Sequence, residues 1–305
     1  MSGSITMFSL DRKSCKAKQK RRSFGEEGKA SDEKPSREPF MDEKTYSIFP
    51  VKEIVRSGDT VEFREQEKPV IGEISLKIFI DTVEYASLLC LNQYPEELAL
   101  GFLFSEGVID SMDDVSSISY NERLFSVMVN LAPGKAVDRC ESLRSMTSGC
   151  GRCFTYINPL KQDKFQAIPI HDRFPVIDIL NAMEEFEGRS ELFRGVGGVH
   201  SVLFHHKEFS VFNEDIGRHN CFDKISGILL RNGKMGLAES GVMFVSGRIS
   251  SEILTKVIRM GVPVVVSRST PTAAAVHLAQ KYRVTLLGYV RRNSGIIYAG
   301  EERLS

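Results

Sequence analysis

The strongest constraint on the fold lies in the last quarter of the sequence, where apolar runs alternate with helical patterns. GVMFV (241–245), VPVVVS (262–267) and TLLGYV (285–290) are apolar without the alternation of a half-buried strand. Between them, ILTKVIRM (253–260) and AAAVHLAQKY (273–282) have helical spacing. Strands of this kind, separated by helices, are typical of a parallel sheet covered on both faces. We therefore predict an α/β domain here.

Further elements are expected upstream of this region. Helices are predicted for PEELALGFLFSEGVI (95–109), FPVIDILNAMEEFE (174–187) and GRHNCFDKISGILLR (217–231), and VHSVLFHHKEFSVFNED (199–215) reads as a hairpin. EISLKIFI and RLFSVMVNLA add two strands nearer the N-terminus. The predicted organisation is a disordered charged tail over 1–45, a smaller N-terminal α+β subdomain over 46–145, a flexible loop over 146–170 and the α/β domain over 171–305.

Charge and cysteine content exclude several classes of protein. The 305 residues carry 40 basic and 40 acidic side chains, so no global charge directs the chain to nucleic acid or to a membrane surface. Four of the six cysteines are scattered singly, which suggests a reducing compartment. RRSF (21–24) is followed by polar GEEGKASDEK and not by the apolar region of an export signal. We expect a cytoplasmic protein without a membrane span.

Three predicted turns carry hydroxyls and arginines at the carboxyl ends of the parallel strands. They are SGRISSE (246–252), SRSTPT (267–272) and YVRRNS (289–294). Free backbone N–H groups make such turns anion sites, and ligands of open α/β sheets gather at this edge. Capping of the helices by Ser and Thr is the simpler explanation of either of the first two turns alone. For the three together we favour a ligand with phosphates and a stackable base. The candidate residues in the first two turns are Ser246, Gly247, Arg248, Ser267, Ser269 and Thr270.

The pair Cys150 and Cys153 lies in the glycine-flanked stretch SGCGRCF. A structural zinc site needs four ligands, and the sequence has no second CxxC. A zinc deaminase would place H-x-E before P-C-x-x-C, whereas His206-Lys207-Glu208 comes after this pair, in an apparent hairpin strand. A thioredoxin-like dithiol should open a helix. A thiolate on a loop, able to accept and pass on a persulfide sulfur, and incidental loop cysteines both remain open.

Six motifs, in order, resemble the formate dehydrogenase accessory sulfurtransferases, the FdhD family. They are ELALGFLFSEGVI, SGCGRC, LFRGVGGVH, NEDIGRHNCFDK, SGRISSEILTKVIRMGVPVVVSRSTPT and LLGYVRR. The resemblance covers roughly residues 46–300 and leaves only the tail outside it. It implies a three-layer fold similar to cytidine deaminase but without the catalytic zinc, so no metal is expected, and it implies a homodimer.

The resemblance also implies a function and a set of site residues. A cysteine desulfurase would donate sulfur to Cys150, with Cys153 as its companion, and the sulfur would pass to the molybdenum cofactor in its bis(molybdopterin guanine dinucleotide) form for formate dehydrogenase. GDP is the expected mimic of this cofactor. The nucleotide-binding segment falls on Tyr289, Val290, Arg291, Arg292, Asn293 and Ser294.

Two further expectations follow from this resemblance, and two other functions stay open. Cys221 stands where we expect a small apolar residue, which predicts buried packing. The CGRC loop is expected to fold over the nucleotide site so that Cys150 reaches the metal. The alternatives are a chaperone that binds the molybdenum cofactor without chemistry and a zinc-dependent deaminase.

Overall fold

The computed structural model describes residues 45–135, 145–146, 154–155 and 165–305. The predicted tail, the cysteine pair and most of the predicted loop over 146–170 lie outside these ranges. Within the described ranges, no helix is both long enough and apolar enough to span a bilayer. All of the described residues fall within one compact unit.

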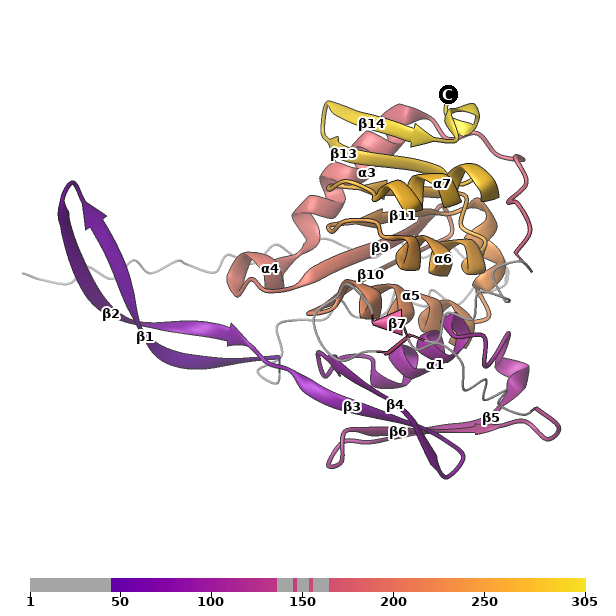
Figure 1. Cartoon of the computed structure of the whole chain (residues 1–305), viewed down its shortest axis with the longest axis horizontal. Helices are drawn as coiled ribbons and strands as arrows, with labels where there is room; N and C mark the ends of the chain where they lie inside the picture. The colour runs from indigo at the N-terminus through magenta and orange to yellow at the C-terminus, as the bar shows by residue number, and fades with distance from the viewer. Residues whose placement is uncertain (1–44, 136–144, 147–153, 156–164) are drawn as a thin grey trace, which may run out of the picture. The chain divides into compact units, whose positions relative to one another are not determined.

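The largest sheet has six strands in the order β10-β9-β11-β12-β13-β14 (Figure 1). Strands β11, β12 and β13 are parallel, as predicted, and β9, β10 and β14 pair antiparallel. The hairpin of β9 and β10 is confirmed, but β14 was not expected. The chain reverses after β13 through a two-residue turn at 292–293, so the sheet has an antiparallel edge on each side. The bounds are β9 His200–His206, β10 Phe209–Asp215, β11 Val242–Val245, β12 Val264–Ser267, β13 Thr285–Arg291 and β14 Ser294–Ala299.

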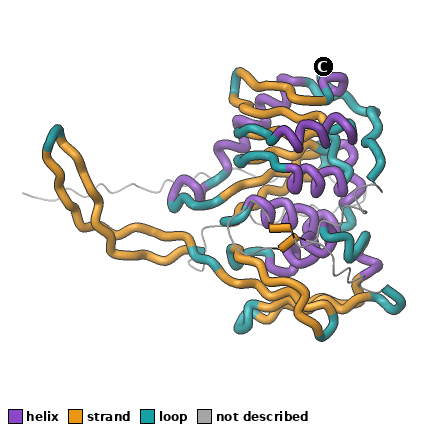
Figure 2. The backbone as a smooth tube through the Cα atoms, in the orientation of Figure 1, coloured by secondary structure: helices purple, strands orange, loops and turns teal. Residues whose placement is uncertain are grey.

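Helices cover both faces of this sheet, which gives the predicted three layers (Figure 2). Helices α5 (Arg218–Arg231), α6 (Ser251–Met260) and α7 (Ala273–Tyr282) pack on one face, and α3 (Val176–Arg189) packs on the other. The strands supply alternate side chains to the two cores: Met243, Val265 and Leu286 to the first, and Phe244, Val264 and Leu287 to the second. The likeness to cytidine deaminase stays a prediction.

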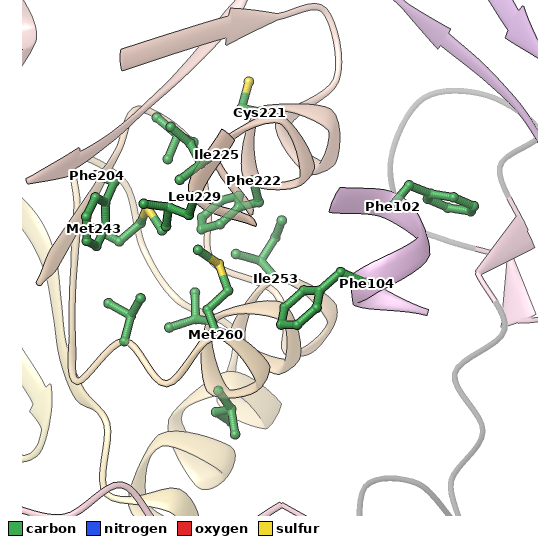
Figure 3. Close-up of a cluster of buried hydrophobic side chains, with 14 of the residues drawn as sticks. Phe102, Phe104, Phe204, Cys221, Phe222, Ile225, Leu229, Met243, Ile253 and Met260 are labelled. Atoms are coloured by element: carbon green, nitrogen blue, oxygen red, sulfur yellow. The ribbon is translucent and has the colours of Figure 1, made fainter. Parts of the chain in front are cut away.

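A second sheet, with the order β4-β3-β6-β5, lies in the N-terminal part of the chain. Helix α1 (Pro95–Ser105) joins its core to that of α5 and α6, and one hydrophobic cluster includes Phe104 of α1, Phe222 of α5 and Ile253 of α6 (Figure 3). The division into a subdomain and a domain stays a prediction. The remaining bounds are β3 Ile74–Ile80, β4 Val83–Cys90, β5 Val115–Asn121, β6 Ser126–Leu131, β7 Ser145–Met146, β8 Phe154–Thr155, α4 Glu191–Gly195 and the 3₁₀ turns Met112–Asp114, Met235–Ser240 and Glu301–Arg303.

A long ribbon that the sequence did not reveal precedes this sheet. Strands β1 (Tyr46–Ser57) and β2 (Thr60–Ile71) pair in continuous register and form a sheet of their own. At its base, Ile71 packs against a small cluster of Leu91, Leu192 and Val199. A Cβ at Gly198, which has a φ of +75°, would lie 3.3 Å from Ile71 Cγ2. The glycine-rich stretch RGVGGVH therefore leaves room for the base of the ribbon.

Helices α1 and α5 approach closely at two glycines, and this contact gives a stability prediction. A Cβ at Gly227 would overlap the carbonyl oxygen of Glu97, and a Cβ at Gly101 would overlap that of Asp223. Because backbone cannot move aside as a side chain can, Gly227→Ala is expected to lower the free energy of unfolding by about 1–3 kcal/mol or more. Chemical denaturation measures this change.

Gly188 in α3 is the matched control. A Cβ there meets nothing within 4 Å. Because alanine is the better helix former, Gly188→Ala should raise stability by about 0.5–1 kcal/mol. Equal effects of the two substitutions would contradict the close helix contact.

Candidate functional site

The turns that follow β11 and β12 are joined by backbone hydrogen bonds. Arg268 N donates to the carbonyl oxygen of Val245 at 3.0 Å, and Ile249 N donates to that of Thr270 at 3.2 Å. Thr272 N returns a bond to Ile249 O at 2.9 Å. The first two predicted turns therefore form one continuous surface at the carboxyl edge of the sheet.

The end of β13 is tied to the same surface. Tyr289 N donates to Ser269 O at 2.9 Å, and the Arg291 guanidinium donates to Arg268 O at 2.5 Å. Gly288 permits this approach, because a Cβ there would lie 2.9 Å from Ser269 O and 2.8 Å from the Tyr298 ring. The structure thus brings together all three turns that the sequence singled out. We call this surface, residues 246–250, 268–272 and 289–294, the three-turn edge.

Three of the predicted binding residues have side chains committed to the fold. The buried Ser267 hydroxyl donates to Gly247 O at 2.7 Å and accepts from Ser269 N. Ser246 Oγ accepts from the backbone N–H of Ser201 at 2.9 Å. Val290 is fully buried in the core beneath α3. For Val290, the prediction of a nucleotide contact can hold only through its backbone.

Of the other predicted residues, Gly247 is buried, and the rest are half-buried or exposed. Ser269 and Thr270 are half-buried. The exposed members are Arg248, Tyr289, Arg291, Arg292, Asn293 and Ser294.

Acidic residues of α3 orient two arginines at this edge. Arg268 Nε lies 2.9 Å from a carboxylate oxygen of Glu187, and Arg292 Nε lies 3.2 Å from one of Glu184. Both guanidinium groups stay substantially exposed, so their remaining N–H groups face solvent. A planar guanidinium with one side held in this way can still present donors to a phosphate.

The capping explanation is correct for two residues that were not site candidates. Ser250 Oγ accepts from Ile253 N at 3.4 Å, and Thr272 Oγ1 accepts from Ala275 N at 3.3 Å. These residues are the N-caps of α6 and α7. Within the three-turn edge, the hydroxyls of Ser250 and Thr272 therefore cap helices, and they are not those of the predicted binding residues.

A cluster of histidines adjoins the three-turn edge, and sequence reasoning missed it. His219 Nε2 lies 3.1 Å from Glu252 Oε2, and both side chains are more than four-fifths buried. His200 packs on Gly247, since a Cβ at that glycine would lie 3.2 Å from its Nδ1. His219 is mostly buried because the first turn of α5 packs against α6. The one feature of the sequence that pointed to these histidines was the high proportion of polar residues in NEDIGRHN (213–220).

Burial lowers the pKa of these histidines. For His219 desolvation outweighs the hydrogen bond that the ring donates to Glu252, which acts in the opposite direction. For His200 burial acts together with the positive charge of Arg218. Neutral imidazoles are therefore favoured in the folded protein at pH 7.

Stability is expected to fall as the pH drops from about 7 to about 5.5. The unfolded chain binds protons at histidine below a pKa of about 6.5, and the folded chain resists this at His200, His205 and His219. Each histidine contributes at most about 1.4 kcal/mol per pH unit. His219→Gln, which keeps an N–H donor, should flatten the dependence of unfolding free energy on pH, and His277→Gln on the exposed face of α7 is the control. A curve unchanged by His219→Gln would contradict this assignment.

The predicted role of Cys221 is confirmed, and the H-x-E placement needs correction. Cys221 is fully buried, its Sγ donates to His200 O at 3.3 Å, and burial raises the pKa of its thiol well above the ordinary value. His206 ends β9 and is itself buried, while Lys207 and Glu208 form the hairpin turn. The motif therefore does not lie within one strand.

Cys150 and Cys153 lie outside the described residues, so their position relative to the three-turn edge is a prediction. In the part of the chain that the structure describes, no three His, Cys, Asp or Glu side chains are grouped so as to hold a metal ion.

Comparison with known proteins identifies the relatives of this chain. Residues 71–305 match the model of the FdhD/NarQ family. The sulfur carrier protein FdhD of Bacillus subtilis is 32% identical over 247 residues, which cover 80% of this chain and 93% of the relative. FdhD of Sulfurisphaera tokodaii is 34% identical over 268 residues, covering 87% of this chain and all of the relative.

A solved structure shares the fold. The crystal structure of a formate dehydrogenase accessory protein from Desulfotalea psychrophila aligns with a TM-score of 0.66 at 21% identity, covering 86% of this chain and all of that one. The family model and the two relatives each cover most of this chain, and the solved structure shares its fold. The chain belongs to the FdhD/NarQ family.

Proposed function

We propose that this protein is a cytoplasmic sulfur carrier that accepts a persulfide sulfur from a cysteine desulfurase. It passes the sulfur to the molybdenum cofactor, in its bis(molybdopterin guanine dinucleotide) form, for use by formate dehydrogenase. The names of its relatives support the carrier role. The observation that carries the proposal to this cofactor is the three-turn edge, where hydrogen bonds join turns with four arginines and an exposed tyrosine.

The chemistry begins at Cys150. Its thiolate attacks the terminal sulfur of the donor's persulfide, the donor's S–S bond breaks, and the donor cysteine leaves as a thiolate. Cys150 then carries the sulfane sulfur. Delivery of that sulfur as sulfide requires two electrons, and Cys153 can supply them by attacking Cys150 and closing a disulfide. A reductant of the thiol class then restores the pair.

The residues of the three-turn edge fit a cargo with purines and pyrophosphates. Arg268 and Arg292 are oriented by Glu187 and Glu184 and keep free N–H groups toward solvent. Tyr289 is 49% exposed, and an exposed aromatic side chain can stack on a base. The protein's part is to hold and orient the cargo, and the cargo supplies the metal that receives the sulfur.

Mass spectrometry after incubation with a cysteine desulfurase and cysteine tests the carrier role. The peptide that contains Cys150 is expected to gain the mass of one sulfur atom and to lose it on treatment with a thiol reductant. A peptide that gains no sulfur while the protein still binds the cofactor would favour the escort function.

Tyr289 gives a test of the binding site that separates binding from folding. Its φ is +52°, in the left-handed region that favours glycine. Tyr289→Gly removes the ring and relieves a strain of about 1–2 kcal/mol, against a glycine entropy cost of about 0.5–1 kcal/mol. We expect unfolding free energy to stay the same or rise by up to about 1 kcal/mol while GDP affinity falls about tenfold, measured by calorimetry.

Arg283 is the matched control, since it has a φ of +55° at the end of α7. Arg283→Gly should change stability in the same direction and leave GDP affinity unaltered. Unchanged GDP affinity in Tyr289→Gly would exclude the ring from the site.

A further inference from the structure

Four polar side chains meet at the carboxyl edge of the large sheet, beyond the end of β11. His200 begins β9, Arg218 and His219 begin α5, and Glu252 lies in the first turn of α6. A Cβ at Gly247 would lie 3.2 Å from His200 Nδ1 and 3.8 Å from Arg218 Cδ, so both side chains converge on that glycine. The hydrogen bond between His219 and Glu252 ties the first turns of the two helices together. We call these four residues the β9–α5 cluster.

The β9–α5 cluster directly continues the three-turn edge. Val202 of β9 pairs with Val245 at the end of β11, so the residues before Val202 run beside the turn that begins at Ser246. Ser246 N donates to Ser201 O at 3.1 Å, and Ser201 N donates to Ser246 Oγ at 2.9 Å. On the other side of β13, the described sheet ends with β14. Among the described strands, the edge therefore extends beyond the three turns only toward this cluster.

The stability of α5 does not explain Arg218. It is the first residue of the helix, where the helix dipole disfavours a positive charge, and no acidic residue occupies that first turn. A half-buried guanidinium in this position is suited to an anion that approaches from solvent. His200 is also half-buried, and a neutral imidazole donates through one ring nitrogen and accepts through the other. The two side chains can therefore contact a polar, negatively charged group.

The whole edge is long enough for an extended cargo. Neighbouring strands lie about 4.8 Å apart, and β13, β12, β11 and β9 are consecutive, so the end of β13 and the start of β9 are about 14 Å apart. Along this line Tyr289 comes first, followed by Arg268 after β12 and Arg248 after β11. His200 and Arg218 come last. An aromatic ring, then guanidinium groups and then a polar cluster match a base joined through phosphates to a reacting group.

We propose that the cargo lies along this edge with its base at Tyr289 and its metal-bearing end at the β9–α5 cluster. Its phosphates then lie between these points, at Arg268 and Arg248. This orientation rests on the proposed function, because it takes the three-turn edge as the nucleotide site. It adds the direction in which the cargo lies and the residues that meet its reacting end.

His200 and Arg218 contact the reacting end in this orientation. During delivery the thiolate of Cys153 attacks Cys150, the bond from Cys150 to the sulfane sulfur breaks, and that sulfur leaves as a sulfide anion with the bonding electron pair. The positive charge of Arg218 stabilises the departing anion, and His200 donates a hydrogen bond to it. These two residues therefore act on the discharge of sulfur and not on the binding of the nucleotide.

Separate measurements of nucleotide binding, sulfur loading and sulfur discharge test this orientation. His200→Gln and Arg218→Gln are expected to bind GDP as the wild type does, which also shows that they are folded, and to load Cys150 from a cysteine desulfurase. Discharge should be about tenfold slower or more, which is the loss of one hydrogen bond to a charged group. Mass spectrometry of the carrier isolated from cells that make formate dehydrogenase should then find more of the added sulfur retained. Arg218→Lys keeps the charge and should recover part of the discharge.

His205→Gln is the matched control, since His205 lies near the other end of β9 and pairs with Ser210 across the hairpin. It should bind GDP, load and discharge as the wild type does. Normal discharge by both His200→Gln and Arg218→Gln, or an equal delay in His205→Gln, would overturn the orientation. So would a loss of GDP affinity in the first two variants as large as that in Tyr289→Gly. If the wild type binds no GDP or takes up no sulfur, the proposed function itself fails and the orientation fails with it.

Discussion

Cys150→Ala is expected to abolish activation of formate dehydrogenase to the level found without the carrier. Alanine removes the sulfur nucleophile, and no other cysteine that the structure describes can replace it. The described cysteines, Cys90 and Cys221, are buried, and burial raises the pKa of the Cys221 thiol. The measurement is formate dehydrogenase activity in a strain that expresses the variant, alongside the mass of the isolated carrier after incubation with desulfurase.

Cys153→Ala and GDP binding are the controls for this prediction. If Cys153 resolves the persulfide, its alanine variant should still take up sulfur but deliver it poorly, so the persulfide form accumulates. Both variants should keep wild-type affinity for GDP, because the three-turn edge is built from other residues. Full activation by Cys150→Ala would refute the carrier mechanism, whereas normal activation by Cys153→Ala would refute only its resolving role.

The central sheet could be predicted because its local signals agree with the tertiary structure. VMFV and the VVV of β12 are apolar at every position, and the structure buries both strands on both faces. The turns after them could be placed at one edge because parallel strands end on the same side. What the sequence did not reveal was how those turns are bound together, since the contacts of Ser269 with Tyr289 and of Arg268 with Arg291 join distant residues.

The ribbon was missed for a physical reason. Its strands contain charged residues on both faces, so the alternation that marks a half-buried strand is weak. Its order comes from cross-strand pairing and not from burial in a core. The alternation of apolar and polar residues predicts a strand only where one face of the strand is buried. It therefore does not predict strands such as β1 and β2, which leave both faces in water.

The contacts of the buried histidines could not be predicted from the sequence either. His219 and Glu252 are 33 residues apart and meet only because the first turns of α5 and α6 pack together. Neither residue has a distinctive neighbour pattern in the sequence. The stretch NEDIGRHN is rich in polar residues, but the tertiary structure decides which residues they contact.

Asp215 of this stretch forms, with Lys224 of α5, the charge pair whose loss should cost the most stability. Lys224 Nζ lies 2.7 Å from Asp215 Oδ2, and both side chains are completely buried. Lys224→Met leaves a buried carboxylate without its counter-charge, which typically costs about 3–5 kcal/mol. Chemical denaturation should show this loss as a lower midpoint with an unchanged dependence on denaturant.

A second substitution distinguishes the lost charge from lost packing. Asp215 also accepts hydrogen bonds from Leu91 N at 3.2 Å, Gly217 N at 3.0 Å and Asn220 Nδ2 at 2.7 Å, so removing its oxygens would leave these donors unpaired. Asp215→Asn keeps one carbonyl oxygen and removes the charge. Added to Lys224→Met, it should recover part of the stability, because a neutral amide costs less to bury than an unpaired carboxylate. If the double variant is less stable than Lys224→Met alone, the hydrogen bonds of Asp215 outweigh its charge, and the ion pair is not the main reason for the loss.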